Sequence, residues 1–192
     1  MVKLALLWHM HQPYYEDLAT GEHILPWVRL HAIKDYWGMV NMLEEFPGVH
    51  LTFNLVPSLL VQVQAFAEDR ARDRHLQIGL KPATELQPDE MEWLVANGFH
   101  APYERMIAPY PRYKELHAAK HARRPFDVGA LRDLQVWHKL AWMDPDKLAT
   151  DERLLQLIEK GSRYSEEDKG TLRQVELEII RDVIPAYRRA LE

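Results

Sequence analysis

Two histidines lie two residues apart near the amino terminus, in the stretch LLWHMHQPYY at residues 6–15. His9 and His11 follow an apolar run that is typical of a strand. If residues 3–11 are extended, their side chains alternate and both imidazoles point to the same face. Histidines at a strand end can bind a metal, contact a substrate or pack in a core. The secondary structure around the two histidines is therefore needed to distinguish these three roles.

Three more side chains suit the binding of a polar small molecule. Trp27 offers an indole face on which a sugar ring can stack, although six tryptophans occur in the chain and most must pack. His31 adds another imidazole close by. Asn54 follows an apolar run and could hold a hydroxyl, fix a histidine tautomer or only cap the next helix.

The neighbours of these candidates have less certain roles. The Gln12 amide could bridge two hydroxyls, although alternation places it on the face opposite the histidines, and Pro13 is expected to end the strand. Arg29 and His31 share a side only in an extended segment. In a helix the two directions differ by about 200°.

The first third of the chain predicts a strand, a helix and a second strand. Residues 2–8 are nearly all apolar, as in a strand covered on both faces, and a long loop is expected over 9–26. Helical spacing over 27–46 ends at Pro47-Gly48, and β-branched alternation follows over 49–56. This order predicts a βαβ unit with parallel strands, whose carboxyl ends are the usual place for ligands.

After Pro57 the chain is predicted to be predominantly helical, with no further convincing strand. The expected helices cover 58–76, 88–99, 110–122, 126–145 and a final segment that Ser165 caps and that runs to residue 192 despite Pro185. The fold class is therefore α/β. Residues 1–57 form the first βαβ unit, and residues 58–192 form a helical segment inserted in or packed on it.

Two parallel strands cannot protect both faces and both edges of a sheet. We therefore expect further strands beyond residue 192, which makes this chain the front part of a longer protein. The alternative is a complete helical domain with a two-stranded ribbon. Apolar surface left by missing strands also predicts self-association.

Composition limits the partners. The net charge is −5, the isoelectric point is about 6.1, and basic residues are mixed with acidic ones, so neither nucleic acid nor a membrane is an expected partner. The absence of cysteine excludes disulfides and thiolate metal sites. With no signal peptide and no apolar run near the ~20 residues that span a bilayer, a cytoplasmic location is expected.

Four stretches resemble a known enzyme family. HMHQP after an apolar strand, then LPWVRLHAIKDYWG, TFNLVPSLLVQ and LQVWHKLAWMDP look like the amino-terminal part of glycoside hydrolase family 57, the α-amylase-like and 4-α-glucanotransferase-like enzymes. The tripeptide HQP at residues 11–13 resembles the family's first signature region. The resemblance extends over nearly the whole chain without indicating a specificity.

This resemblance implies an incomplete (β/α)7-type barrel with a helical segment inserted after its second strand. It also implies a retaining hydrolase or transglycosidase of carbohydrate metabolism that acts on α-linked glucans, with no cofactor. The family's Glu nucleophile and Asp acid/base belong to later signature regions that nothing here matches, so no catalytic residue is assigned. The residues expected to bind an α-glucan or oligosaccharide are His11, His9, Trp27, His31 and Asn54.

The positions of the acidic residues also give no reason to assign a catalytic residue. Retaining glycoside cleavage needs two carboxyl groups about 5–5.5 Å apart across one bond. Glu16 and Asp17 lie in the loop beside the histidines, but acids in such loops are usually only solvated. The other candidates are expected on solvated helix faces: Glu44, Glu45, Glu166, Glu167, Asp168, Glu176 and Glu178. The chain alone is therefore expected to be inactive.

Two alternatives stay open. A shortened domain could bind carbohydrate or a protein without catalysis. A metal-dependent, deacetylase-like barrel could use His9 and His11 as ligands. However, His23, His31 and His50 show no spacing that demands coordination, so no metal is expected.

Overall fold

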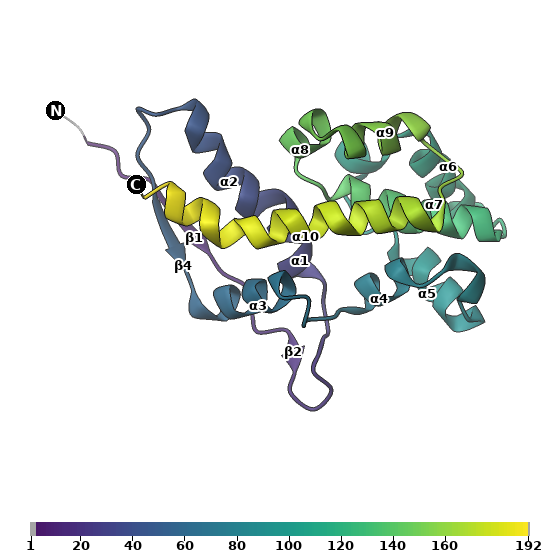
Figure 1. The fold of residues 1–192 in the computed structure, drawn as a ribbon. Helices are drawn as coiled ribbons and strands as arrows, with labels where there is room; N and C mark the ends of the chain where they lie inside the picture. Colours follow the sequence, from purple (N-terminus) through teal and green to yellow (C-terminus); the bar gives the residue numbers. More distant parts are fainter. Residues whose placement is uncertain (1–2, 192) are drawn as a thin grey trace. The chain divides into compact units, whose positions relative to one another are not determined.

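The computed structural model describes residues 3–191, which are rich in helix and contain two short parallel strands (Figure 1). Residues 3–73 and 177–191 belong to one compact unit, called here the N-terminal unit. Residues 74–176 form the second, called the helical unit. The boundary expected between residues 57 and 58 concerns the arrangement of a whole barrel and stays a prediction.

The two strands of the N-terminal unit pair in parallel, as predicted. Strand β1 (Leu7–Met10) lies beside β4 (Thr52–Leu55), and His9 is directly opposite Asn54. Both strands are shorter than the predicted 2–8 and 49–56, of which residue 2 lies outside the described part. Pairing covers four residues on each strand. Just outside it, the Leu6 carbonyl accepts from the Thr52 amide at 3.0 Å and the Val56 amide donates to the Met10 carbonyl at 3.3 Å.

One face of this sheet is packed and the other is open. The packed face carries Met10 and Phe53, whose partner is Tyr187 near the end of the chain. On the other face Leu7 is 62% exposed and His9 is exposed. The expectation that the first strand is covered on both faces is therefore wrong for the described residues, because its apolar alternation meets a helix on one side only.

The predicted helix over 27–46 forms as one run with a widened middle. It begins with α1 (Trp27–His31), passes through the π-helical turn η1 (Ala32–Tyr36) and continues as α2 (Trp37–Asn41) and the 3-10 turn η2 (Met42–Glu45). Its apolar stripe is fully buried. That stripe comprises Val28, Leu30, Ala32 and Ile33.

The loop predicted over residues 9–26 contains a small hairpin. Strands β2 (Glu16–Asp17) and β3 (Glu22–His23) pair antiparallel across a turn in which Gly21 has φ +70°. Glycine adopts this left-handed conformation at little steric cost. Two residues per strand are too few to show a periodic pattern in the sequence, which explains why the hairpin was not predicted.

The single helix predicted over 58–76 is wrong. Helix α3 (Pro57–Ala67) ends early, and α4 (Arg74–Leu80) begins after a turn in which Asp69 has φ +57°. In that turn Asp73 pairs with Arg29 through two hydrogen bonds of 2.7 and 3.0 Å. This buried ion pair, between residues 44 positions apart, holds the turn against a helical continuation.

The helical unit packs around aromatic side chains. Trp137, Tyr113 and Tyr164 are each no more than 2% exposed, and Trp137 donates a 2.9 Å hydrogen bond to the Gly161 carbonyl. The remaining elements of this unit are η3 (Ala83–Glu85), α5 (Pro88–Asn97), the π-helical turn η4 (Tyr103–Ile107), α6 (Pro111–His121), α7 (Val128–Ala141), α8 (Pro145–Thr150) and α9 (Glu152–Lys160).

The last helix, α10 (Glu166–Arg189), confirms the predicted helix after Ser165 but ends at Arg189, before the predicted end at residue 192, which lies outside the described part. Ser165 caps it, because its hydroxyl accepts from the Asp168 amide while the Asp168 carboxylate accepts from the Ser165 amide. The helix continues through Pro185. In the described part of the chain, no helix has the length and apolar character that crossing a bilayer requires.

Candidate functional site

His9, His11 and Asn54 come together at the carboxyl ends of the two parallel strands. The imidazole rings of His9 and His11 stack with centroids 5.9 Å apart and planes 13° apart. All three side chains are exposed. The structure thus confirms that the two histidines share a face, and it places Asn54 beside the same strand end.

The contact between His9 and Asn54 determines what His9 can offer a ligand. The Asn54 amide nitrogen lies 2.9 Å from Nδ1 of His9. Because an amide NH2 only donates, Nδ1 must accept, which places the proton of the neutral imidazole on Nε2. Of the three roles considered for Asn54, this geometry matches the positioning of a histidine tautomer, and Nε2–H of His9 remains available as a donor.

Gln12 connects the strand end to the first helix rather than facing the histidines. Its amide nitrogen donates to the Tyr36 hydroxyl and its amide oxygen accepts from the Tyr15 hydroxyl, both at 2.9 Å. The expected ability to bridge two hydroxyls is therefore used inside the protein. Burial raises the pKa values of Tyr15 and Tyr36, so both hydroxyls keep their protons at neutral pH.

Gln62 holds the segment that follows the histidines, and sequence reasoning missed it. This buried side chain of α3 donates to the Pro13 carbonyl and accepts from the Tyr15 amide, both at 2.9 Å. Ser58, one turn earlier on α3, donates to the Gln12 carbonyl at 3.0 Å. The backbone of residues 12, 13 and 15, which follows β1, is therefore held by two side chains of α3, Ser58 and Gln62.

Trp27 and His31 lie together on the first helix. Their ring centroids are 6.2 Å apart, and the ring of His31 is 6.0 Å from that of Tyr36. Because Gln12 also contacts Tyr36, a chain of contacts joins the segment after His11 to His31. The five predicted binding residues thus form two groups, which the Gln12–Tyr36 hydrogen bond connects.

Asp35 is a site residue that sequence reasoning did not identify. Its carboxylate lies 2.5 Å from Nδ1 of His31 and 2.9 Å from the Lys34 ammonium. Burial would raise the pKa of Asp35, but the hydrogen bonds from His31 and Lys34 outweigh burial and lower it. Asp35 therefore stays ionised and orients the imidazole. The spacing of four residues on a predicted helix was the signal in the sequence.

Arg29 does not join this group. The segment is helical, so Arg29 points away from His31 and is buried at 2% exposure in its ion pair with Asp73. Two donors on two acceptor oxygens satisfy both charges in the interior. Arg29 therefore has a structural role.

The nearby acids also have structural roles. Glu16 accepts a hydrogen bond from the Tyr14 hydroxyl, and Asp17 accepts from the Ala19 amide in the hairpin turn. One of the other acids was predicted wrongly: Glu176 is fully buried, not solvated. It accepts hydrogen bonds from Lys139 at 2.8 Å and Arg173 at 2.7 Å. The positive charges of these two side chains offset the cost of removing the carboxylate from water.

The histidine pair does not form part of a larger metal-binding cluster. Among residues 3–191, the structure brings together no group of three or more histidine, cysteine, aspartate and glutamate side chains that could hold an ion. The site is instead a polar surface of imidazole and amide donors with an indole nearby, which suits a neutral polyhydroxylated ligand.

Comparison with known proteins gives the family. Searches of curated proteins and of solved structures found no match. The sequence pattern of glycosyl hydrolase family 57 matches residues 5–191, which is nearly the whole chain. This family implies a glycoside hydrolase or transferase that acts on glucans, within a (β/α)-type fold. The polar surface at the strand ends and the extent of this match agree, and the chain belongs to glycosyl hydrolase family 57.

Proposed function

We propose that the chain is the amino-terminal, substrate-binding part of a retaining hydrolase or transglycosidase that acts on α-linked glucans. The observation that carries this proposal is the family match over residues 5–191, together with the position of His9 and His11 at the carboxyl ends of parallel strands. In parallel α/β folds, ligands bind at these ends. In this proposal β1 and β4 are the first two strands of a (β/α)7-type barrel.

Each site residue has a defined part in this proposal. His9 donates from Nε2 to a sugar hydroxyl, since Asn54 occupies its Nδ1. His11 stacks on His9 and contacts a neighbouring hydroxyl. His31, oriented by Asp35, reaches the sugar with Nε2, and Trp27 offers its indole face to a pyranose ring.

The described residues supply binding groups without a catalytic pair. Asp35 is engaged by His31 and Lys34, and Glu16 by Tyr14. Carboxylates held in this way fit positioning roles, whereas cleavage with retention needs two carboxyl groups about 5–5.5 Å apart across the bond. We therefore propose that the 192-residue chain is inactive by itself.

Titration with maltoheptaose tests the binding role. Imidazole NMR signals of His9 and His11 should shift saturably, and His11→Ala should weaken binding by about three- to tenfold, the equivalent of one lost hydrogen bond of roughly 0.7–1.4 kcal/mol. His50→Ala is the matched control, since this exposed histidine lies before β4 and outside the site. Absence of any shift, or equal weakening by both variants, would contradict the proposal.

An activity assay tests the absence of the catalytic pair. The purified chain should release no reducing ends from maltoheptaose and should form no longer transfer products. Turnover that survives rigorous purification would show that acids of this chain perform the chemistry. Saturable maltoheptaose binding without turnover is the combined result that the proposal requires.

Exposed apolar side chains support a further part of the proposal, self-association. Leu4, Leu7 and Ile24 are 82, 62 and 69% exposed on the N-terminal unit. Such surface favours contact with another chain. Sedimentation velocity should show concentration-dependent association, and a monomer at all concentrations would contradict it.

A further inference from the structure

Two histidines of the helical unit converge on one point outside the family site. His117 and His121 are four residues apart near the end of α6, so they lie on the same face of the helix. Their Nε2 atoms are 3.2 Å apart. His121 is exposed and His117 is partly exposed, so solvent ions can reach both rings.

The distance between the two Nε2 atoms matches the distance between two nitrogens that bind the same metal ion. Imidazole nitrogens bind zinc at about 2.0–2.1 Å, so two of them at a tetrahedral angle lie about 3.3 Å apart. The observed 3.2 Å contact is a hydrogen bond between the two rings, so a bound metal ion would replace its proton while the nitrogens keep nearly the same separation. Histidines at this helical spacing supply two ligands in known metal-binding motifs.

Neighbouring aromatic rings fix the orientation of His117. Phe99 meets it edge-on with centroids 5.4 Å apart, and Tyr103 lies 4.9 Å away on α6's neighbouring segment. Phe99 is itself buried and stacks on Tyr113. Ring orientation is therefore set before any ion binds, which reduces the entropy lost on binding.

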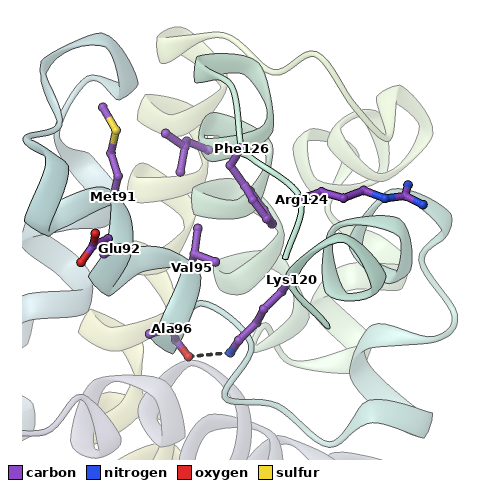
Figure 2. Close-up of a pocket in the computed structure, with 8 residues that line it drawn as sticks. Met91, Glu92, Val95, Ala96, Lys120, Arg124 and Phe126 are labelled. Atoms are coloured by element: carbon purple, nitrogen blue, oxygen red, sulfur yellow. Dashed lines mark hydrogen bonds between the residues drawn. The ribbon is translucent and has the colours of Figure 1, made fainter. Parts of the chain in front are cut away.

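The lysine that lies between the two histidines in the sequence is engaged elsewhere. The Lys120 ammonium is directed toward α5, where it donates to the Ala96 carbonyl at 2.7 Å (Figure 2).

The end of the helix also favours a cation. His117 and His121 occupy the last two turns of α6, an eleven-residue helix that ends at His121. The carboxyl end of a helix carries partial negative charge, which stabilises positive charge nearby. Nitrogen spacing, ring orientation and helix polarity all point to the same kind of ligand.

We propose that His117 and His121 bind a divalent transition-metal ion through their Nε2 atoms, with Cu²⁺ preferred over Ni²⁺ and Zn²⁺. Imidazole ligands suit these ions, and the order of affinity follows from their intrinsic ligand preference. Within residues 3–191 no third histidine or carboxylate completes a cluster, so water fills the remaining positions. Bound metal would fasten the last two turns of α6 to each other.

Titration of the full chain with NiCl2 tests this site by NMR. Paramagnetic broadening should centre on residues 117–121, and CuCl2 should produce it at lower concentration than NiCl2. His121→Gln should weaken the binding at least tenfold, because one of two ligands is lost.

Two controls separate this site from the other histidines of the chain. The double variant His9→Gln/His11→Gln should leave the broadening at α6 unchanged, and so should His100→Gln. Broadening centred on residues 9–11 instead of 117–121, or equal affinity in His121→Gln, would overturn the proposal. Both α6 histidines are accessible to solvent, so their replacement leaves the core intact and unchanged helix content should confirm folding.

Discussion

The two units differ in how completely they cover their apolar side chains. In the N-terminal unit, Leu4 and Leu18 are 82 and 84% exposed. In the helical unit, Leu155 has the highest exposure of the described large apolar residues, at 43%. The helical unit thus covers its large apolar residues more completely, while the N-terminal unit leaves several exposed, including Leu7 on the open sheet face beside His9.

The same contrast holds for polar groups. The helical unit buries Glu176 and pairs it with Lys139 and Arg173. The N-terminal unit keeps His9 and Asn54 at its surface, where they retain hydrogen-bonding capacity for a ligand. Polar residues in one unit stabilise the fold, whereas those at the strand ends of the other remain available for binding.

Truncation of a side chain in each unit should show the largest difference. Trp137→Ala removes a buried indole and its hydrogen bond to Gly161, and should lower the free energy of unfolding by about 3–5 kcal/mol. Leu7→Ala, on the open sheet face, should change it by no more than about 0.5 kcal/mol. Urea denaturation followed by circular dichroism measures both. Equal effects would show that the open face is covered in solution.

Loss of Gln62 should have an intermediate effect, confined to the N-terminal unit. Gln62→Leu leaves the Pro13 carbonyl and the Tyr15 amide without their partner, at a cost of about 1–3 kcal/mol. Amide hydrogen exchange should accelerate over residues 13–15 and stay unchanged in the helical unit. Gln64→Leu on the same helix is the control, since this side chain is exposed and bonds only Glu68. Uniform acceleration in both units would contradict the assignment.

Mild acid should weaken the N-terminal unit by a smaller amount. Burial is the largest cause that lowers the pKa of His23 below 6.5, and it outweighs the opposing charges of Glu16 and Asp73. Unfolded chains therefore bind a proton more readily than folded ones, so stability falls as the pH drops below about 6.5. Denaturation midpoints at several pH values between about 7.5 and 5.5 measure this dependence.

Two variants check that His23 causes the effect. His23→Leu should flatten the pH dependence, because the residue that titrates differently in the two states is gone. His50→Gln should keep it, since His50 is exposed. An unchanged slope in His23→Leu would assign the pH dependence to other groups.

Local patterns in the sequence were enough to predict the strand end of the site. Alternation in residues 3–11 predicted that His9 and His11 share a face, and their stacked rings confirm it. The order of strand, helix and strand predicted the parallel pair that places Asn54 opposite His9. These features depend on neighbouring residues or on connection length, which a single sequence contains.

Long-range pairing explains most of what could not be predicted. The break before α4 depends on Asp73 meeting Arg29, and the burial of Glu176 depends on Lys139, 37 residues away. No local pattern distinguishes such paired charges from solvated ones. The ring contact of Phe99 with His117 likewise joins residues 18 positions apart.

Some signals were present and were overlooked. Asp144 and Asp151 each accept a backbone hydrogen bond at the start of α8 and α9, as aspartate does at helix starts. Gly161 ends α9 with φ +67°. Aspartate before a helical run and glycine after it predict both ends of α9, so this helix could have been identified.

The π-helical turn η1 has a consequence for insertions and deletions in the first helix. A π turn closes over five residues instead of four, so His31 and Tyr36 come to lie on the same side. Deleting one residue from 32–35 would restore the ordinary pitch and keep Tyr36 on the side of His31, because residues four apart share a helix face. Inserting a further residue would instead rotate Tyr36 by about 100°, away from Gln12, although every side chain of the strand end would remain. Helical phase, as well as residue identity, is therefore part of what this segment encodes.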